Sequence, residues 1–292
     1  MIETILKEKQ KIINEALKTL LVPDRPETVL LYEAMNYSLL AGGKRIRPAL
    51  FLMTLDLLGV EEGPYLPAAL SIECIHTYSL IHDDLPAMDD DDYRRGRPTN
   101  HKVYGAGMAT LAGDGLLTFA FDLLSSMSAV SDSDKCAMIS ILAKAAGPAG
   151  MVGGQAQDIS SEGKKLSLAE LAVMDRGKTG CLLTAPVDMA AVCGKAPQKE
   201  RAALHDFASH LGLLFQITDD LLDVVGSTEE LGKNAGQDAL LQKATYAALL
   251  GVAGAREKAA EEGEAAKDAL SLFGQNADPF RALADYLLHR TK

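Results

Sequence analysis

Residues 197–225 read PQKERAALHDFASHLGLLFQITDDLLDVV. Apolar residues recur in this stretch at spacings of three and four, which predicts one long and largely buried helix. The same spacing continues along almost the whole chain, and we find no convincing stretch of alternating apolar and polar residues between turn residues. The sequence therefore predicts an all-α fold.

Proline and glycine residues divide the chain into about ten predicted helices. No Ser/Gly/Pro-rich linker, sharp change of composition or repeat of fixed period separates one part from another. We therefore expect a single domain over residues 1–292. The predicted breaks between helices are Pro23 and Pro26, Gly42-Gly43, Pro64 and Pro67, Gly96 to Pro98, Gly147-Pro148, Gly194 to Pro197, and Gly226.

The overall composition limits the classes of protein to consider. The chain has 292 residues, of which 48% are hydrophobic and 24% charged, and this is typical of a globular protein. The formal net charge of -11 argues against a nucleic-acid partner, because binding along a duplex needs a basic face. The N-terminal segment MIETILKEKQKIINEAL is unlike a signal or transit peptide, and no apolar run is expected to reach membrane-spanning length. We therefore expect a cytoplasmic protein without a membrane anchor.

The cysteines show no C-x-x-C pairing, and each lies in an apolar, helix-like stretch. This pattern argues against a zinc site or a disulfide framework and predicts reduced core residues. The four cysteines are Cys74, Cys136, Cys181 and Cys193.

Two aspartates of the long predicted helix point to a bound cation. Asp219 and Asp223 are one turn apart, so their carboxylates leave the same face of the helix, about 40° from each other around its axis. Two carboxylates on an otherwise buried helix are costly unless cations hold them. A solvated helix face is the alternative, but the surrounding FQITDDLLDVV is very apolar for such a face.

A second acidic segment, residues 83–89, reads DDLPAMD and ends an apolar stretch that is expected to be helical from about Pro64. In a continuous helix Asp83 and Asp89 would point about 120° apart. Pro86 disfavours helix at the residue before it, which allows a turn that folds Asp89 back toward Asp83. Taken alone, this segment also fits a calcium loop or an acidic tail, although it lacks the alternating acids and central glycine of an EF-hand.

The sequence has two groups of basic residues, one well before the acidic segment and one directly after it. Residues 42–48 read GGKRIRP and supply Lys44, Arg45 and Arg47, while Arg94 and Arg95 follow the acidic segment. Carboxylates that hold Mg²⁺ together with guanidinium and ammonium groups are what a diphosphate requires. The alternatives are a solvated turn before a helix and a local balance of the acidic charges. The conjunction with two aspartate clusters favours a diphosphate site.

The sequence closely resembles the trans-prenyltransferases, or polyprenyl synthases, and among them especially the bacterial farnesyl diphosphate synthases. The resemblance covers nearly the whole chain and follows the order of the family's motifs. These motifs are GGKRIRP, ECIHTYSLIHDDLPAMDDDDYRRGRPTNH, LAGDGLL, GGQAQD, KTG, QITDDLLDVVGSTEELGKNAGQD and KATY.

This resemblance implies a single large bundle of about ten or more mostly antiparallel helices around a central cavity, in a homodimer. It implies three Mg²⁺ ions per site when a diphosphate is bound, held by Asp83, Asp89 and Asp219, with Asp84 and Asp223 in support. It implies contacts with the allylic diphosphate from Arg94 and Lys233. It implies contacts with isopentenyl diphosphate from Lys44, Arg47, His76 and Arg95. Positions that match those flanking the allylic carbons and diphosphate are Lys178, Thr179 and Gln216.

The residues around Lys178 and Thr179 agree with that placement. Gly177 and Gly180 stand inside a helical pattern, where each costs about 1 kcal/mol relative to Ala, so we expect a kink that frees a backbone carbonyl. That carbonyl, the Thr179 hydroxyl and the Gln216 amide would present negative dipoles to a carbocation. The alternatives are that Thr179 bonds to its own helix and that Gln216 only ties helices together.

Further polar residues of the sequence are weighed between a place in the site and a structural role. His76 precedes Asp83 by seven residues and so lies on nearly the same helix face, which favours a place in the cavity. Gln155 and Asp158 match a family motif, but an interhelical polar network explains them at least as well. We assign Asp90 to Asp92 to a solvated extension, and His82 to a structural role.

Tyr78 is expected to set the length of the product. It lies five residues before Asp83, or about 7.5 Å further down the helix from the metal ligands. Tyr78 would reach the cavity from the flank, and Ser79 would face it more directly. The family resemblance associates an aromatic residue here, together with two extra residues inside the first aspartate motif, with farnesyl synthases of bacterial type. Ordinary helix packing is the alternative.

The implied reaction is a head-to-tail condensation of isopentenyl diphosphate with dimethylallyl or geranyl diphosphate to give farnesyl diphosphate and pyrophosphate. Geranylgeranyl or geranyl diphosphate synthase is the alternative within the family. A terpene cyclase and a catalytically silent regulatory homologue are less favoured, because both aspartate clusters and the Lys44, Arg47 and His76 set are intact. The basic end, residues 290–292, resembles a tail that folds over isopentenyl diphosphate, although a frayed helix end fits it equally well.

Overall fold

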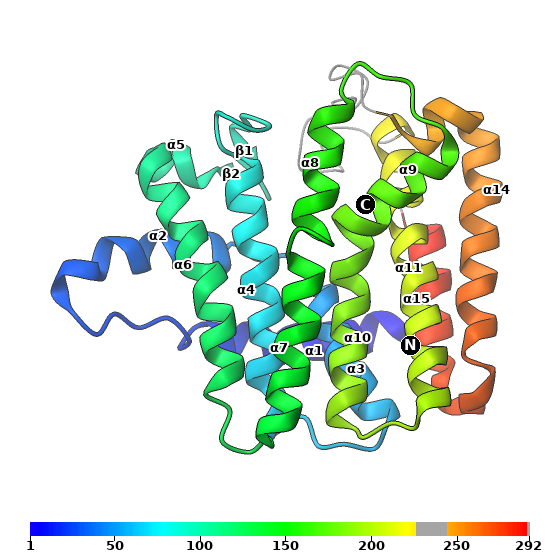
Figure 1. The fold of residues 1–292 in the computed structure, drawn as a ribbon, viewed down its shortest axis with the longest axis horizontal. Coiled ribbons are helices and arrows are strands. Elements are labelled where there is room, and N and C mark those ends of the chain that lie inside the picture. The colour runs from blue at the N-terminus through cyan, green and yellow to red at the C-terminus, as the bar shows by residue number, and fades with distance from the viewer. Residues whose placement is uncertain (226–243, 291–292) are drawn as a thin grey trace. The chain divides into compact units, whose positions relative to one another are not determined.

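The computed structural model describes residues 1–225 and 244–290, and these are helical almost throughout (Figure 1). The strands among them are β1 (Tyr93–Arg94) and β2 (Arg97–Pro98), which form a short antiparallel hairpin. The all-α fold predicted from the apolar spacing is confirmed.

The chain divides into two compact units. The N-terminal unit comprises Glu3–Asp56 and Glu61–Ile139, and the C-terminal unit comprises Met1–Ile2, Leu57–Val60 and Ser140–Lys292. The single domain expected from the sequence stays a prediction.

The N-terminal unit is organised around α4 (Leu66–Asp83), which packs against α6 (Ala106–Ser125). The segment Ala68–Ile75 of α4 is buried on every side, and all of its residues except Glu73 are apolar or small. The other helical elements with residues in this unit are α1 (Ile2–Leu17), η1 (Pro26–Thr28), α2 (Val29–Leu39), α3 (Ile46–Leu57), η2 (Gly63–Tyr65), α5 (Asn100–Tyr104) and α7 (Asp132–Ala146).

A buried ion pair lies in the core of the N-terminal unit. The side chains of Arg45 and Glu73 are each 1% exposed, and the guanidinium of Arg45 contacts the Glu73 carboxylate. It also donates hydrogen bonds to the carbonyl oxygen of Leu39 at 2.7 Å and to Oδ1 of Asn14 at 3.0 Å. Arg45 belongs to the basic set that the sequence associates with a diphosphate. The structure corrects that association, because every side of this guanidinium is enclosed by the unit itself.

The C-terminal unit is organised around α11 (Gln198–Val225), which packs against α10 (Cys181–Cys193), α14 (Tyr246–Ala269) and α15 (Asp278–His289). The long helix predicted to begin at about Pro197 is therefore confirmed. The remaining helical elements of this unit are α8 (Met151–Ser161), α9 (Leu168–Asp175), the π-helix η3 (Arg176–Gly180) and the 3-10 helix η4 (Ser271–Ala277).

Glycines bring η3 into backbone contact with two neighbouring helices. A Cβ atom added to Gly154 of α8 would lie 2.1 Å from the backbone nitrogen of Lys178. A Cβ atom added to Gly212 of α11 would lie 2.9 Å from the Cα atom of Gly180. Because neither position has room for a side chain, the π-helix is held by its backbone from two sides.

Two expectations about buried and apolar residues need correction. Two helical stretches, Ala106–Ser125 and Asp132–Ser161, are long and apolar enough to cross a membrane by length and composition, a test that core helices of soluble proteins also pass. The expectation that no apolar run has this length was wrong. Cys74 and Cys193 are buried and Cys181 is partly buried, but Cys136 is exposed on α7 and is not a core residue.

Candidate active site

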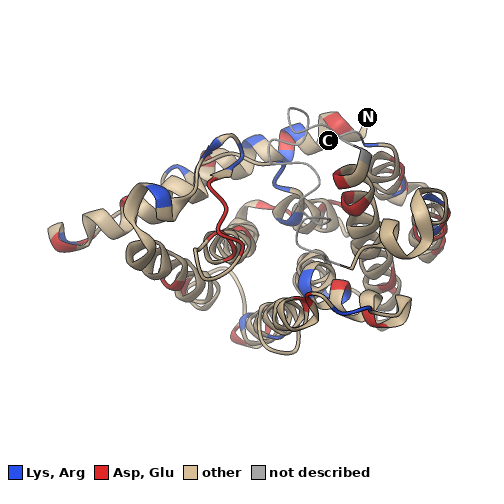
Figure 2. Cartoon of the chain, turned by 90° about the horizontal axis from the view of Figure 1, so that it is seen from above, with Lys and Arg blue, Asp and Glu red and all other residues tan. Residues whose placement is uncertain are grey.

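The first aspartate segment begins where α4 ends. The helix stops at Asp83, and the backbone N–H of Asp89 donates a hydrogen bond to the carbonyl oxygen of Asp83 at 2.9 Å. The turn that Pro86 predicts is therefore confirmed, and it folds Asp89 back beside Asp83. The run of consecutive aspartates at the end of this loop, residues 89–92, is drawn as a red segment in Figure 2.

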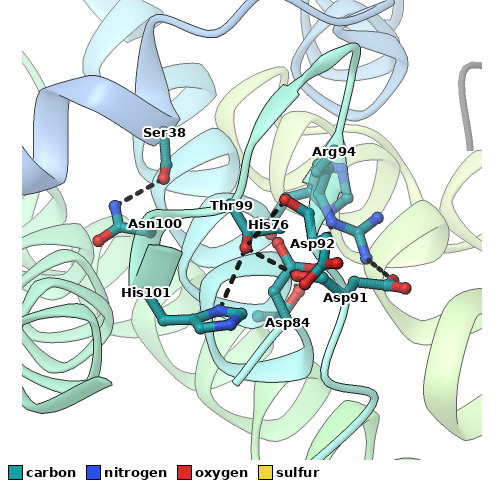
Figure 3. Close-up of polar contacts among 10 residues, drawn as sticks. Ser38, His76, Asp84, Asp91, Asp92, Arg94, Thr99, Asn100 and His101 are labelled. Carbon is teal, nitrogen blue, oxygen red and sulfur yellow. Dashed lines mark hydrogen bonds and ion pairs between the residues drawn. The ribbon is translucent and has the colours of Figure 1, made fainter. Parts of the chain in front are cut away.

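Asp84 is the buried member of this segment, with 3% of its surface exposed. The pKa of its carboxyl group is raised to about 7, mainly by burial and also by the charges of Asp91 and Asp83, although Arg94 acts in the opposite direction. The Arg94 Nε–H donates to Asp84 Oδ1 at 2.6 Å (Figure 3). One guanidinium therefore does not compensate this carboxylate fully, and additional positive charge nearby would favour its ionised form.

Asp90, Asp91 and Asp92 of the loop pair with cations that follow them in the chain, Arg94 and Lys102. Lys102 Nζ lies 2.7 Å from a carboxylate oxygen of Asp92 and 3.9 Å from one of Asp90. The hydroxyl of Thr99 donates to the carbonyl oxygen of Asp91 at 2.7 Å (Figure 3). These contacts fix the path of the loop and agree with leaving Asp90 to Asp92 out of the proposed metal site.

A basic group gathers on the same unit. Arg47 Nη1 lies 3.4 Å from His76 Nε2. Burial, followed by the charges of Arg47, Arg95 and Arg94, lowers the pKa of His76 well below its usual value, so this imidazole is neutral near pH 7. The Arg95 guanidinium donates to the carbonyl oxygen of Gly42. Lys44, from the same turn, is exposed.

The second aspartate cluster lies on α11 in the C-terminal unit. The side chain of Asp219 is 44% exposed, whereas Asp223 is buried. The Arg290 guanidinium pairs with Asp219, lies 4.3 Å above the ring of Phe215 and donates to Thr218 Oγ1 at 3.2 Å. The Arg290 guanidinium therefore pairs with Asp219, one of the predicted metal ligands.

The sequence interpretation missed the contact between Arg290 and Asp219. The resemblance placed the basic end of the chain over isopentenyl diphosphate instead. Thr218 and Asp219 lie three and four residues after Phe215, so both side chains are neighbours of Phe215 on the surface of α11. The spacing of these three residues indicates a surface that could bind a cation. It does not indicate that the cation is Arg290, which lies 71 residues from Asp219.

The irregular helix predicted at Gly177 to Gly180 is present, but as a π-helix and not as a kink. The backbone N–H of Cys181, the residue after η3, donates to the carbonyl oxygen of Arg176, five residues earlier. Single π-turns inside α-helices often occur at functional sites. The hydroxyl of Thr179 donates to Oε1 of Gln216 at 2.9 Å, so the structure brings these two predicted residues together.

Lys178 lies on the same π-helix and pairs with Asp158 of α8. This contact crosses between two elements of the C-terminal unit. It agrees with the interhelical network that was one of the two interpretations of Asp158.

Asp220 was assigned no role from the sequence, although it lies between Asp219 and Leu221 in the acidic motif. It is buried, accepts a hydrogen bond from Gln216 Nε2 at 2.8 Å and accepts another from the backbone N–H of Tyr246 at 2.8 Å. Its distance of four residues from Gln216 is the helical spacing for such a contact, so a signal was present in the sequence.

Three residues with expected roles fall outside what the structure describes. Lys233, a predicted contact to the allylic diphosphate, belongs to the undescribed range 226–243. Thr291 and Lys292 of the basic end are also outside the described residues.

The residue types at both aspartate segments fit Mg²⁺. Carboxylate oxygens are its preferred protein ligands, and Mg²⁺ is usually held by one or two carboxylates together with substrate phosphates. Within residues 1–225 and 244–290, no three His, Cys, Asp or Glu side chains form a group that could hold a metal on their own. The poorly compensated Asp84 indicates that positive charge is favourable at the first segment, and the ion pair of Asp219 with Arg290 indicates the same for the second.

Comparison with known proteins identifies the family. The polyprenyl synthetase profile matches residues 28–275. The chain belongs to the polyprenyl synthetase family. The family resemblance seen in the sequence is thereby confirmed, and prenyl synthases of this family depend on Mg²⁺.

Relatives within the polyprenyl synthetase family match nearly the whole chain. Farnesyl diphosphate synthase of Geobacillus stearothermophilus is 50% identical over 289 residues, which are 98% of this chain and 95% of that protein. The chloroplastic geranylgeranyl pyrophosphate synthase of Capsicum annuum is 46% identical over 97% of this chain and 77% of its own length. The solved structure of an FPP/GFPP synthase from Zymomonas mobilis is similar with a TM-score of 0.87, 37% sequence identity and 98% of both chains covered. These similarities confirm the predicted isoprenoid synthase fold.

Proposed function

We propose that the chain is a Mg²⁺-dependent prenyltransferase that condenses isopentenyl diphosphate head to tail with dimethylallyl or geranyl diphosphate. The products are farnesyl diphosphate and pyrophosphate. The observation that carries this proposal is the 50% identity to a farnesyl diphosphate synthase, over a chain that keeps both aspartate segments. Family members with geranylgeranyl products are also similar, so a longer product is the second candidate.

The aspartates would hold the metal. Asp83 and Asp89 from the turn after α4 and Asp219 from α11 would bind three Mg²⁺ ions, with Asp84 and Asp223 in support. The bound metal supplies charge that neutralises the diphosphate as it leaves. The backbone hydrogen bond from Asp89 to Asp83 brings these two residues together at the turn, which supports a shared role for them.

The basic residues would bind the two diphosphates. Arg94 and Lys233 would contact the allylic diphosphate, and Lys44, Arg47, His76 and Arg95 would contact isopentenyl diphosphate. Guanidinium groups suit this role because their fork of donors matches phosphate oxygens. The neutral His76 can accept from Arg47 at one ring nitrogen and donate to a phosphate oxygen from the other.

Lys178, Thr179 and Gln216 would surround the allylic carbons after ionisation. The oxygen atoms of Thr179 and Gln216 place negative dipoles beside the developing positive charge, and fixed dipoles of this kind are effective in a site without water. Departed pyrophosphate would accept the proton that the condensation product loses, so no side chain is needed as a base.

Product analysis tests this function directly. Purified chain, Mg²⁺ and isopentenyl diphosphate would be combined with each allylic starter, and the products identified by mass spectrometry. We expect fifteen-carbon diphosphate from both dimethylallyl and geranyl diphosphate. A cyclised hydrocarbon made from one diphosphate substrate alone would indicate a terpene cyclase, and no turnover of any starter would indicate a silent homologue.

Tyr78→Ala is expected to shift the main product from fifteen carbons to twenty or more. The Tyr78 ring is buried and packs edge-to-face against His82, with ring centroids 5.7 Å apart. His82 in turn lies against Gly113 of α6, where a Cβ atom would come within 2.1 Å of its ring. This packing holds the tyrosine ring in place, so removing the ring opens space that a rearranged neighbour cannot easily fill.

The matched control for the product-length prediction is Tyr78→Phe, which keeps the ring and removes only the hydroxyl. It should retain the fifteen-carbon product under excess isopentenyl diphosphate. If Tyr78→Ala also stops at fifteen carbons, then Tyr78 is not the floor and the neighbouring Ser79 becomes the next position to test.

Arg290→Gln is expected to lower the Mg²⁺ concentration needed for half-maximal activity by about two- to fivefold. The guanidinium occupies Asp219, so a metal ion must displace it, and a partly exposed ion pair of this kind contributes about 0.2–1 kcal/mol. Mg²⁺ titrations of activity and of heat release would measure the change. A tail that instead covers isopentenyl diphosphate predicts a raised KM for that substrate and an unchanged Mg²⁺ requirement.

We further propose a cytoplasmic homodimer without a membrane anchor. Helix α6 exposes Leu111 and only half buries Leu117 and Phe121, although it is one of the most apolar helices of the chain. A helix that is apolar on most sides is normally buried, and a second copy of the chain would cover it. Asp114 and Asp122 on α6 argue against a membrane span. Sedimentation equilibrium should give twice the 31.1 kDa of one chain.

A further inference from the structure

Asp220 sits at the centre of a chain of hydrogen bonds in the C-terminal unit. Only 4% of the surface of Asp220 is exposed to solvent. One carboxylate oxygen accepts from Nε2 of Gln216 at 2.8 Å, and the other accepts from the backbone N–H of Tyr246, the first residue of α14, at 2.8 Å. Gln216 continues the chain, because its Oε1 accepts from the hydroxyl of Thr179 at 2.9 Å.

The direction of every bond in this chain follows from Asp220. Gln216 turns its NH₂ group toward one oxygen of Asp220, and the backbone N–H of Tyr246 faces the other; both groups can only donate, so both oxygens of Asp220 accept. The amide oxygen of Gln216 must then face Thr179. Since the single hydroxyl proton of Thr179 is used in that bond, only lone pairs of the Thr179 oxygen remain for a ligand.

We infer that Asp220 is a positioning residue that fixes the polarity of Gln216 and Thr179, so that both present oxygen lone pairs to an allylic cation. This inference rests on the proposed prenyltransferase function. Asp220 is not proposed to touch substrate or reacting atoms. It acts through Gln216, and its second bond to the N–H of Tyr246 prevents the carboxylate from rotating away.

Replacement of the carboxylate by an amide distinguishes this role from simple packing. In Asp220→Asn one oxygen remains, and the backbone N–H of Tyr246 requires it. The new NH₂ group then faces Gln216, whose amide must reverse to present its own oxygen. Its NH₂ group would point at Thr179, and the Thr179 hydroxyl proton would turn toward the cation site.

Steady-state kinetics of Asp220→Asn provide the first test. Misdirected dipoles at a charged transition state typically reduce turnover by about a hundredfold, so we expect kcat to fall by about 10–100-fold. KM for both diphosphates should change less than twofold, because their proposed phosphate contacts are elsewhere. Asp206→Asn, an exposed aspartate on the same helix, serves as the matched control and should leave both constants unchanged.

A charge exchange provides the second test. In Gln216→Glu/Asp220→Asn, the Asn NH₂ group donates to one Glu oxygen and Thr179 donates to the other, so the original polarity returns. This double variant should recover most of the lost kcat. Gln216→Glu alone should have a low kcat, because it places two carboxylates next to each other. If Asp220→Asn does not fold, the comparison of Gln216→Glu with the double variant still decides the question.

A binding measurement tests the orientation of the Gln216 and Thr179 dipoles without catalytic turnover. Calorimetry would compare an allylic diphosphate analogue that carries an ammonium group in place of the cationic carbon with its neutral carbon isostere. Asp220→Asn should weaken the ammonium analogue about tenfold and leave the isostere unchanged, and the double variant should restore the difference. Equal weakening of both analogues, normal kcat in Asp220→Asn, or no recovery in the double variant would overturn the inference. A wild-type chain that forms no prenyl product would instead overturn the proposed function on which the inference rests.

Discussion

Asp83→Ala and Asp219→Ala are each expected to lower kcat by about a thousandfold while the helical content of the chain stays the same. Each variant removes a proposed ligand from one of the two aspartate segments. Metal charge at a departing diphosphate is worth several kcal/mol, and each 1.36 kcal/mol corresponds to a tenfold change in rate. Turnover with saturating isopentenyl and geranyl diphosphate measures the loss, and far-UV circular dichroism measures the helical content.

The control for the aspartate variants is Asp122→Ala, which removes an exposed carboxylate from α6. It should leave kcat within a factor of two. The two site variants test different segments, so their results are informative separately. Near-normal activity in Asp83→Ala or in Asp219→Ala would show that the corresponding segment does not contribute essential ligands, and the proposal of two cooperating clusters would fail.

Arg45→Met is expected to lower the free energy of unfolding by about 3–5 kcal/mol. Removal of one partner from a buried ion pair leaves the other charge without compensation, and this is among the most costly single changes. Glu73 would be left in the core with its side chain 1% exposed, and the carbonyl of Leu39 would lose its donor. Urea denaturation followed by circular dichroism measures the change in free energy.

The neighbouring variant Lys44→Ala supplies the comparison for Arg45→Met. Lys44 is exposed, so the unfolding free energy should change by no more than about 0.5 kcal/mol. In Arg45→Met/Glu73→Leu both charges are gone, and a large part of the lost stability should return. Wild-type stability in Arg45→Met would show that the ion pair does not stabilise the core. Failure of the double variant to recover would show that packing and not charge causes the loss.

Local patterns were sufficient to predict the parts of the fold that depend on neighbouring residues. Apolar spacing predicted α11, and Pro86 predicted the turn that returns Asp89 to Asp83. Contacts between distant residues were not accessible in this way. The sequence shows Arg45 only as one cation among several, and nothing in its neighbours indicates that Glu73 encloses it.

The site shows the same division between local and distant information. Thr179 and Gln216 were predicted together through the family resemblance, and the hydrogen bond between them agrees with that. The contact between Gln216 and Asp220 could have been predicted, because the two residues are four positions apart in one helix. The contact between Asp220 and Tyr246 could not, because it depends on how α14 packs against α11. The sequence also predicted a kink at Gly177 to Gly180, because glycine indicates a weak helix without saying whether the helix bends or widens.

The π-helix at Arg176–Gly180 is equivalent to one residue inserted into a continuous α-helix from Leu168 to Cys193. One additional residue rotates everything after it by about 100° relative to everything before it. Deletion of Gly177, which has no side chain, would restore an ordinary helix, yet it would rotate Thr179 away from Gln216 relative to the residues before the deletion. The position of the Thr179 hydroxyl therefore depends on the number of residues in this helix. Substitution of side chains cannot replace the inserted residue.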